Sequence, residues 1–248
     1  MNLLGGEATI EKQLGYYSDN FISTTYVNED TQEITTTIIK NTMNKKQWYY
    51  HIPVLRGITI YFIQEFTKGK KFIPDGRIIL VPIIYLVDKF FLHIGLMNYF
   101  YIGFLLLLLL VARLNNDMTE LHGAEHMCAT YYNENKTISV AEINEIKKTS
   151  RFHKQCGTTL IMKNIILFLI LSIFIKDYFI KFFLVTGITY EIFKYQDNKV
   201  MKVLLYFDTM ISKFIQLNIF TKDPKDIHIK MAIDAINKLE NMENKIAS

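Results

Sequence analysis

Long apolar runs alternate with polar segments along this chain of 248 residues. One apolar region spans residues 77–112 and ends in FLLLLLLVA, and a second spans 160–195 and is split by a lysine and an aspartate. Because a helix needs roughly 20 apolar residues to cross a bilayer, each region predicts a pair of transmembrane helices. Charged residues leave open whether 77–96 crosses fully. We therefore predict a mainly α-helical, polytopic membrane protein with about four transmembrane helices.

The residues before the first apolar region predict a small β element and an interfacial helix. Residues 21–27 and 33–39 are rich in β-branched and aromatic side chains, which predicts a β-hairpin within a cytosolic N-terminal element of residues 1–50. Paired glycines within 5–14 allow the backbone to approach another element closely, but taken alone this stretch indicates a flexible terminus. Residues 51–76 predict a helix that lies along the membrane interface.

Polar residues also dominate the middle and the end of the chain. Residues 113–159 separate the two predicted transmembrane hairpins, and a short helix is expected after Ser139 within this segment. The last part, residues 196–248, predicts an interfacial amphipathic helix over 203–220. A further helix is predicted over 226–239, and its apolar stripe consists of Ile229, Ile233 and Ile236.

The distribution of charge predicts the orientation and the partners of the chain. Lysine and arginine residues are frequent before residue 77 and within 113–159, whereas the turn near Gly95 has none. The positive-inside rule then places both termini in the cytoplasm, as in a multi-pass protein of a bacterial inner (cell) membrane. The net charge of +4 is scattered, which favours membrane lipids as partners and argues against nucleic acid. The two cysteines suggest no disulfide framework, and no oligomeric state is predicted.

The polar central segment carries the candidate chemistry. It opens with HGAEH, closes with RFHKQCGT, and holds both cysteines and three of the 6 histidines. His122 and His126 lie one helical turn apart, as two imidazole ligands of a metal do, and Glu125 completes the pattern H-x-x-E-H. His153 and Cys156 form a second close pair, H-x-x-C. The predicted cofactor is zinc, or another divalent transition metal, held by His122, His126, His153 and Cys156.

Two classes of function are compatible with such a site. In a metal-dependent hydrolase, three of the four residues hold the ion, Glu125 takes a proton from water, and Arg151 or Arg56 binds an anionic group of a lipid-linked or peptide substrate. In a scaffold, assembly factor or transporter component, all four residues close a structural site. A third possibility is a polar path for ions or small solutes, lined by Asp88, Lys89, His93 and Glu191.

Six short motifs resemble, in the same order, those of the bacterial YqhQ-like membrane proteins. This chain has GGEATIE, PVLRG, HGAEH, SRFHKQCGT, GITYEI and TKDP, where the family has patterns close to GGQAVIEG, P-x-LRG, HGAEHK, SR-x-HPRCGT, GISYE and TREP. That family is a domain of unknown function described as predicted metal-dependent, so the resemblance implies a membrane fold and a site but no substrate. Cys128 lies off the pattern and is expected to be a small buried residue. By position, the motif residues are Gly5, Gly6, Glu11, Arg56, His122, Glu125, His126, Arg151, His153, Cys156, Gly157 and Glu191.

Overall fold

A computed structural model gives the fold of the chain. It describes residues 1, 3, 5–28, 31, 33–41, 51–58, 89, 103, 106, 107 and 109–247. The chain divides into two compact units, and each is described by itself. The first unit comprises residues 1–41, 109–158 and 210–248, and the second comprises 42–108 and 159–209.

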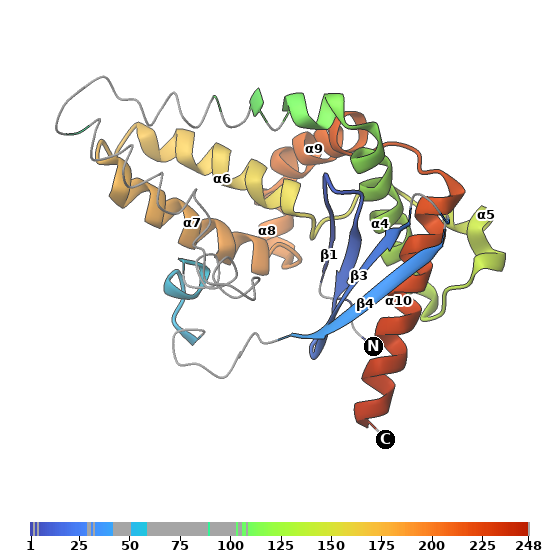
Figure 1. Cartoon of the computed structure of the whole chain (residues 1–248). Coiled ribbons are helices and arrows are strands. Elements are labelled where there is room, and N and C mark those ends of the chain that lie inside the picture. Colours follow the sequence, from blue (N-terminus) through green and yellow to red (C-terminus); the bar gives the residue numbers. More distant parts are fainter. Residues whose placement is uncertain are drawn as a thin grey trace. The chain divides into compact units, whose positions relative to one another are not determined.

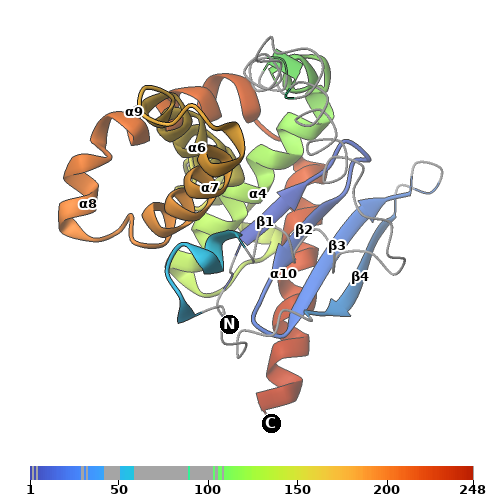
Figure 2. The same ribbon diagram turned by 90° about the vertical axis from the view of Figure 1, so that its left-hand side faces the viewer.

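A four-stranded antiparallel sheet forms one layer of the first unit. Its strands are β1 (Gly5–Ala8), β2 (Leu14–Tyr17), β3 (Phe21–Val27) and β4 (Ile34–Lys40), and they lie side by side in chain order (Figure 2). The predicted hairpin is present as β3 and β4. The first glycine-rich stretch is an edge strand, because β1 pairs with β2, and the expectation of a flexible terminus was wrong.

Two long helices cover one face of this sheet. Helix α4 (Asn116–Asn135) and helix α10 (Asp226–Ala247) contact each other, and α10 crosses the middle strands while α4 lies against β1 and β2 (Figure 2). The predicted apolar stripe of α10 faces the sheet and is buried, with exposures of 0% to 2%. It packs with side chains of both layers in a single core, whose fully buried members include Leu14, Tyr16, Leu121, Tyr132, Ile229 and Ile236.

Shorter helical elements complete the first unit, and one of them, α9, begins in the second unit. The helix expected after Ser139 consists of a 3-10 turn, η3 (Val140–Glu142), and α5 (Ile143–Ile146), and the Glu142 carboxylate accepts the Ser139 N–H at 2.7 Å. Helix α9 (Tyr206–Ile215) ends in a π-helical turn, η4 (Gln216–Phe220). The helix predicted over 203–220 is thus present but changes its hydrogen-bonding pattern before it ends. Such π-helical turns are frequent at functional sites.

The second unit contains a helical hairpin. Helices α6 (Gly157–Ser172) and α7 (Tyr178–Lys194) lie side by side (Figure 1), and α8 (Lys199–Leu204) follows. The rings of Phe168 and Tyr178 meet at a centroid distance of 5.7 Å. Two buried lysines are each bound by a polar side chain, since the Lys163 ammonium pairs with Asp208 and the Lys181 ammonium donates to Ser172.

The prediction of a polytopic membrane protein is contradicted by these helices. Of the helices that the structure describes, none combines the length and the apolar character needed to cross a membrane. The second apolar region forms helices of 16 and 17 residues, whereas a span needs roughly 20. The first predicted pair, over 77–112, lies largely outside the described residues, as does most of the predicted interfacial helix over 51–76. The predicted four-span fold and the multi-pass location derived from it are therefore wrong.

Candidate metal centre

Helix α4 brings the H-x-x-E-H residues into the core of the first unit. Asn115 is the N-cap of this helix, because its side chain accepts the Met118 N–H at 3.0 Å. The side chains of His122, Glu125 and His126 then share one face, since residues three and four positions apart lie one turn apart. His126 is 1% exposed and Glu125 is 4% exposed. The motif is therefore a buried polar cluster rather than a set of surface histidines.

Cys156 completes a tight group of three donors. It lies just before helix α6, and its Sγ is 3.2 Å from Nε2 of His122. One donor atom from each of His122, His126 and Cys156 lies within 4.8 Å of the other two. Two imidazoles and a thiolate are ligands that zinc accepts. Cys156 thus meets two histidines that lie 30 and 34 positions before it in the sequence.

The fourth predicted ligand, His153, lies beside this group but outside its tightest part. Its ring centroid is 5.6 Å from that of His126, whereas the His122 and His126 rings are 4.4 Å apart. Burial lowers the pKa of His153, and the charge of His122 adds to this effect. A neutral imidazole is the form that binds a metal. His153 is therefore placed to be a fourth donor or to stand next to an open position.

Main-chain carbonyls orient the two histidines of α4. Nδ1–H of His122 can donate to the carbonyl of Phe220 at 3.0 Å, and Nδ1–H of His126 can donate to the carbonyl of Arg151. In that tautomer each Nε2 carries the lone pair that a metal-binding histidine requires, and at His122 this lone pair faces Sγ of Cys156. Nε2 of His126 is buried and has no hydrogen-bond partner within the described part of the chain. A buried nitrogen without a partner is costly, and a metal ion would satisfy it.

The Glu125 carboxylate faces both imidazoles. Its Oε2 lies 3.4 Å from Nε2 of His126 and 3.9 Å from Nε2 of His122. Burial raises the pKa of Glu125 to about 8, and burial holds the pKa of His126 well below its ordinary value. A carboxyl whose pKa lies near neutral pH can take and return a proton under physiological conditions.

The sheet supports Glu125 from its other side. The Tyr16 hydroxyl on β2 donates to the Glu125 main-chain carbonyl at 2.9 Å. The β1 backbone comes so close that a Cβ on Gly6 would lie 2.4 Å from Oε1 of Glu125. Only a glycine permits this approach. The GGEA motif therefore forms one wall of the candidate site, a role that its spacing from HGAEH could not reveal.

The remaining predicted site residues make other contacts. The Arg151 guanidinium donates to the Thr221 carbonyl at 2.8 Å and pairs with Asp223 at 3.2 Å. In the second unit, Arg56 and Glu191 bind each other, with an Nε to Oε1 distance of 2.7 Å. Glu11, in the turn between β1 and β2, is exposed and accepts a hydrogen bond from Gln13 at 3.4 Å. Cys128 is fully buried, as expected.

A second cluster of metal-type residues was not recognised in the sequence. Donor atoms of Asp117, Glu120 and His228 lie within 4.8 Å of one another. However, the Lys225 ammonium is 3.2 Å from Asp117 and 3.1 Å from Glu120, so both carboxylates already share a cation. We interpret this cluster as an ion-pair network that joins the start of α4 to the start of α10.

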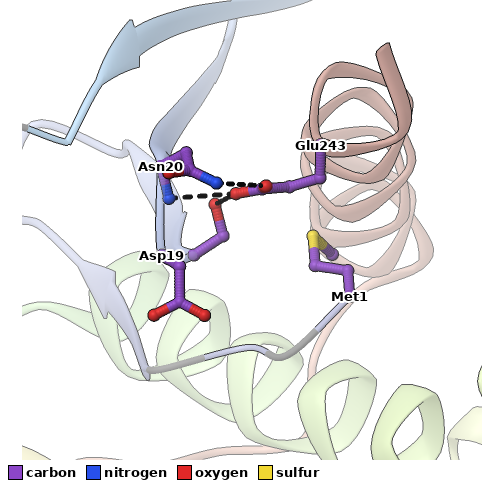
Figure 3. Close-up of a pocket in the computed structure, with 5 residues that line it drawn as sticks. Met1, Asp19, Asn20 and Glu243 are labelled. Atoms are coloured by element: carbon purple, nitrogen blue, oxygen red, sulfur yellow. Dashed lines mark hydrogen bonds between the residues drawn. The ribbon is translucent and has the colours of Figure 1, made fainter. Parts of the chain in front are cut away.

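An open pocket of about 290 Å³ lies away from these donors, beside the C-terminal part of α10 (Figure 3). Its lining carboxylate, Glu243, accepts hydrogen bonds from the Asn20 main chain at 3.0 Å and from the Asn20 side chain at 2.8 Å. Ser18 donates to the same carboxylate. Because these bonds fix the helix to the turn between β2 and β3, the pocket has a structural explanation and contains none of the predicted site residues.

Comparisons with known proteins identify the family. The chain is 28% identical over 170 residues to the uncharacterized protein YqhQ of Bacillus subtilis (strain 168), an alignment that covers 63% of this chain and 49% of YqhQ. The chain thus spans about half the length of the curated relative it matches. No solved structure matches. A model of the family described as "Protein of unknown function (DUF1385)" matches residues 77–242, a range that contains His122, His126, His153 and Cys156. The resemblance to YqhQ-like proteins is therefore confirmed, and the chain belongs to the DUF1385 family.

Proposed function

We propose that this protein binds zinc, or a related divalent transition metal, through His122, His126 and Cys156, and that it is a metal-dependent hydrolase. The observation that carries the proposal is the buried Nε2 of His126. This atom is oriented by a hydrogen bond at Nδ1, lacks a hydrogen-bond partner among the described residues, and faces a thiol, a second imidazole and a carboxylate. A metal ion satisfies all of these groups at once.

Glu125 would act as the general base. A metal held by the three donors would supply Lewis acidity, which lowers the pKa of water towards neutrality. The Glu125 carboxylate lies 3.4 Å and 3.9 Å from the two imidazole nitrogens, so it is next to the place where the reacting water would be bound. Its raised pKa suits a group that takes a proton near neutral pH and delivers it to a leaving group.

The substrate class to test first is a peptide. A lipid-linked substrate was expected because a membrane location was predicted. None of the described helices is long and apolar enough to cross a membrane, so this reason no longer favours a lipid-linked substrate. The anionic group was expected to bind Arg151 or Arg56, but both guanidinium groups already have carboxylate partners, Asp223 and Glu191. A neutral amide or ester bond does not need a free arginine at the site.

A second candidate function is a closed structural metal site in a non-catalytic scaffold or assembly factor. The low exposure of the donors favours this alternative, because Cys156 is 8% exposed and His126 is 1% exposed. In that case His153 is the fourth ligand and no position remains open. The ion would then join helix α4 to the loop before α6, and its removal would destabilise the fold.

Metal content tests the proposal. The purified protein is analysed by elemental mass spectrometry as wild type, His126→Ala, His153→Ala and Glu125→Gln, with His228→Ala as the control for loss of a buried histidine elsewhere. We expect near-stoichiometric zinc in the wild type, Glu125→Gln and His228→Ala, and loss of zinc in His126→Ala. Folded wild-type protein without metal after growth and purification in zinc would refute both candidate functions.

The same variants distinguish a hydrolase from a structural site. If His153→Ala keeps the metal while Glu125→Gln keeps it and loses peptide hydrolysis, the site is open and catalytic. If His153→Ala loses the metal and Glu125→Gln behaves like wild type in every assay, the site is closed and structural. Cobalt substitution adds a direct measure, because the visible spectrum of Co²⁺ in place of zinc reports the coordination number and the thiolate ligand.

A further inference from the structure

One short segment contacts all three histidines of the candidate metal centre, directly or through one residue. It consists of the π-helical turn η4 and the two residues after it, and we refer to Gln216–Lys222 as the orienting segment. Phe220 accepts the hydrogen bond of His122 at 3.0 Å. His126 donates to the carbonyl of Arg151, whose guanidinium in turn donates to the Thr221 carbonyl at 2.8 Å.

The contact to His153 is made by the side chain of Gln216. Its Oε1 accepts the His153 N–H at 3.1 Å, and its Nε2 donates to the His153 carbonyl at 3.2 Å. The amide therefore binds both main-chain groups of one residue. Gln216 is 0% exposed, so water does not compete for these bonds. These two bonds fix the His153 backbone. The His153 ring then lies with its centroid 5.6 Å from that of the His126 ring.

The orienting segment is itself fixed against α4. The Gln216 carbonyl accepts the Thr221 N–H and the Thr221 hydroxyl, both at 2.8 Å, which closes the turn. The Lys222 N–H donates to the Thr119 carbonyl at 2.9 Å. On the next turn of α4, a Cβ on Gly123 would lie 2.1 Å from the Lys222 carbonyl, so the two backbones are in direct contact. The segment thus has little freedom to move relative to the histidines of α4.

We infer that the orienting segment sets the geometry of the metal centre, and that Gln216 is the positioning residue that holds His153 at it. The inference rests on the proposed metal site in the form in which His153 is a further donor to the ion, so it fails if His153→Ala binds zinc as tightly as wild type. Groups that orient metal-binding histidines typically change metal affinity about 10- to 100-fold when they are removed. Because the Gln216 amide binds main-chain atoms of His153, we infer that it acts through that residue and does not itself bind the ion.

The test compares Gln216→Met with Ser212→Ala. Methionine keeps the length of the side chain but neither accepts the His153 N–H nor donates to its carbonyl. Ser212 is a matched control, because it is fully buried one turn earlier in α9 and its hydroxyl has no hydrogen-bond partner within the described part of the chain. Gln216→Glu is a second variant that keeps the acceptor and loses the donor.

Two quantities are measured on each protein. The zinc dissociation constant is obtained by competition with a chromophoric chelator, at a temperature where circular dichroism shows every variant folded. The exchange rate of the His153 amide hydrogen is obtained by mass spectrometry on protein freed of metal. We expect Gln216→Met to bind zinc 10- to 100-fold more weakly and to lose amide protection, Gln216→Glu to bind with intermediate affinity and to keep protection, and Ser212→Ala to stay within about twofold of wild type.

Failure of this inference is distinguishable from failure of the metal site. If wild type binds zinc and Gln216→Met binds it as tightly as Ser212→Ala, the positioning role is refuted while the metal site stands. If wild type binds no zinc, the proposed function is refuted. The positioning role at a metal is then refuted with it, and the amide exchange decides only whether Gln216 holds the His153 backbone, because unchanged protection of His153 in Gln216→Met overturns that hold whether or not zinc binds.

Discussion

Replacing Gly6 by alanine should disturb the candidate site through a single methyl group. The Cβ of alanine at this position would lie 2.4 Å from Oε1 of Glu125 and 2.7 Å from its Cγ and Cδ. Gly5, the preceding residue of the same strand, has no atom within 4 Å of the corresponding position. The variants Gly5→Ala and Gly6→Ala therefore share any effect of losing glycine's backbone entropy, and they differ in the contact with Glu125.

The size of the disturbance follows from these distances. Oε1 of Glu125 would have to retreat by about 1 Å to reach the 3.4 Å at which ordinary van der Waals contact begins. Oε2 of the same carboxylate lies 3.4 Å from Nε2 of His126, so a shift of about 1 Å in the carboxylate also changes its distance to the imidazole. A functional group must be held within about 0.5 Å of its productive position. Overpacking of this kind costs about 1–3 kcal/mol of unfolding free energy.

Urea denaturation and zinc competition measure the two consequences. We expect Gly6→Ala to lower the free energy of unfolding by about 1–3 kcal/mol and to weaken zinc binding about tenfold or more. Gly5→Ala should stay within about 0.5 kcal/mol of wild type and bind zinc normally. Equal stability and equal zinc affinity of the two variants would show that β1 is not a wall of the site, and would refute the reasoning.

Two further predictions concern buried charge. The pKa of Glu125 is raised by burial to about 8, above its ordinary value of 4.5, so the metal-free folded state holds this proton more tightly than the unfolded state does. The buried Glu125 carboxyl therefore adds to the free energy of unfolding below about pH 4.5, and this contribution is lost as the pH rises to about 8. In denaturant titrations with chelator, Glu125→Gln should abolish this decline, and an unchanged pH profile would contradict the buried position. In the second unit, Arg56→Leu should cost about 3 kcal/mol, because it leaves the Glu191 carboxylate without its cation, while zinc content stays at the wild-type level. Loss of zinc from folded Arg56→Leu would instead assign this arginine to the metal site.

Short-range sequence patterns were sufficient to predict some of the secondary-structure elements. The β3–β4 hairpin follows from two β-branched runs separated by a polar turn, and the apolar stripe of α10 follows from a period of 3 to 4 residues. The same periodicity placed His122 and His126 on one face of α4. By contrast, β1 contains two glycines and no β-branched residue, and its pairing with β2 became visible only in the sheet.

The error over the membrane has a different origin. Hydropathy counts apolar residues along a run, but it does not report which polar groups meet inside the fold. The second apolar region stops at Ser172 and resumes at Tyr178, so neither helix reaches the length of a span. The Lys163 ammonium within this region is buried against Asp208, a partner 45 residues later. Pairing over that separation is not encoded in a window of 20 residues.

The orientation of the candidate ligands could not be predicted from the sequence. A pattern such as H-x-x-E-H names the residues that can bind a metal, but the hydrogen bond at the other ring nitrogen decides whether each Nε2 presents a lone pair. Here both α4 histidines use main-chain carbonyls, those of Phe220 and Arg151. Every residue type supplies a carbonyl, so the side chains at these two positions carry no signal of the role. Gln216 is the exception, because it uses its side chain on His153. A substitution of Gln216 changes how a candidate ligand is held but leaves the ligand itself in place. A substitution of a histidine removes the ligand together with its orientation.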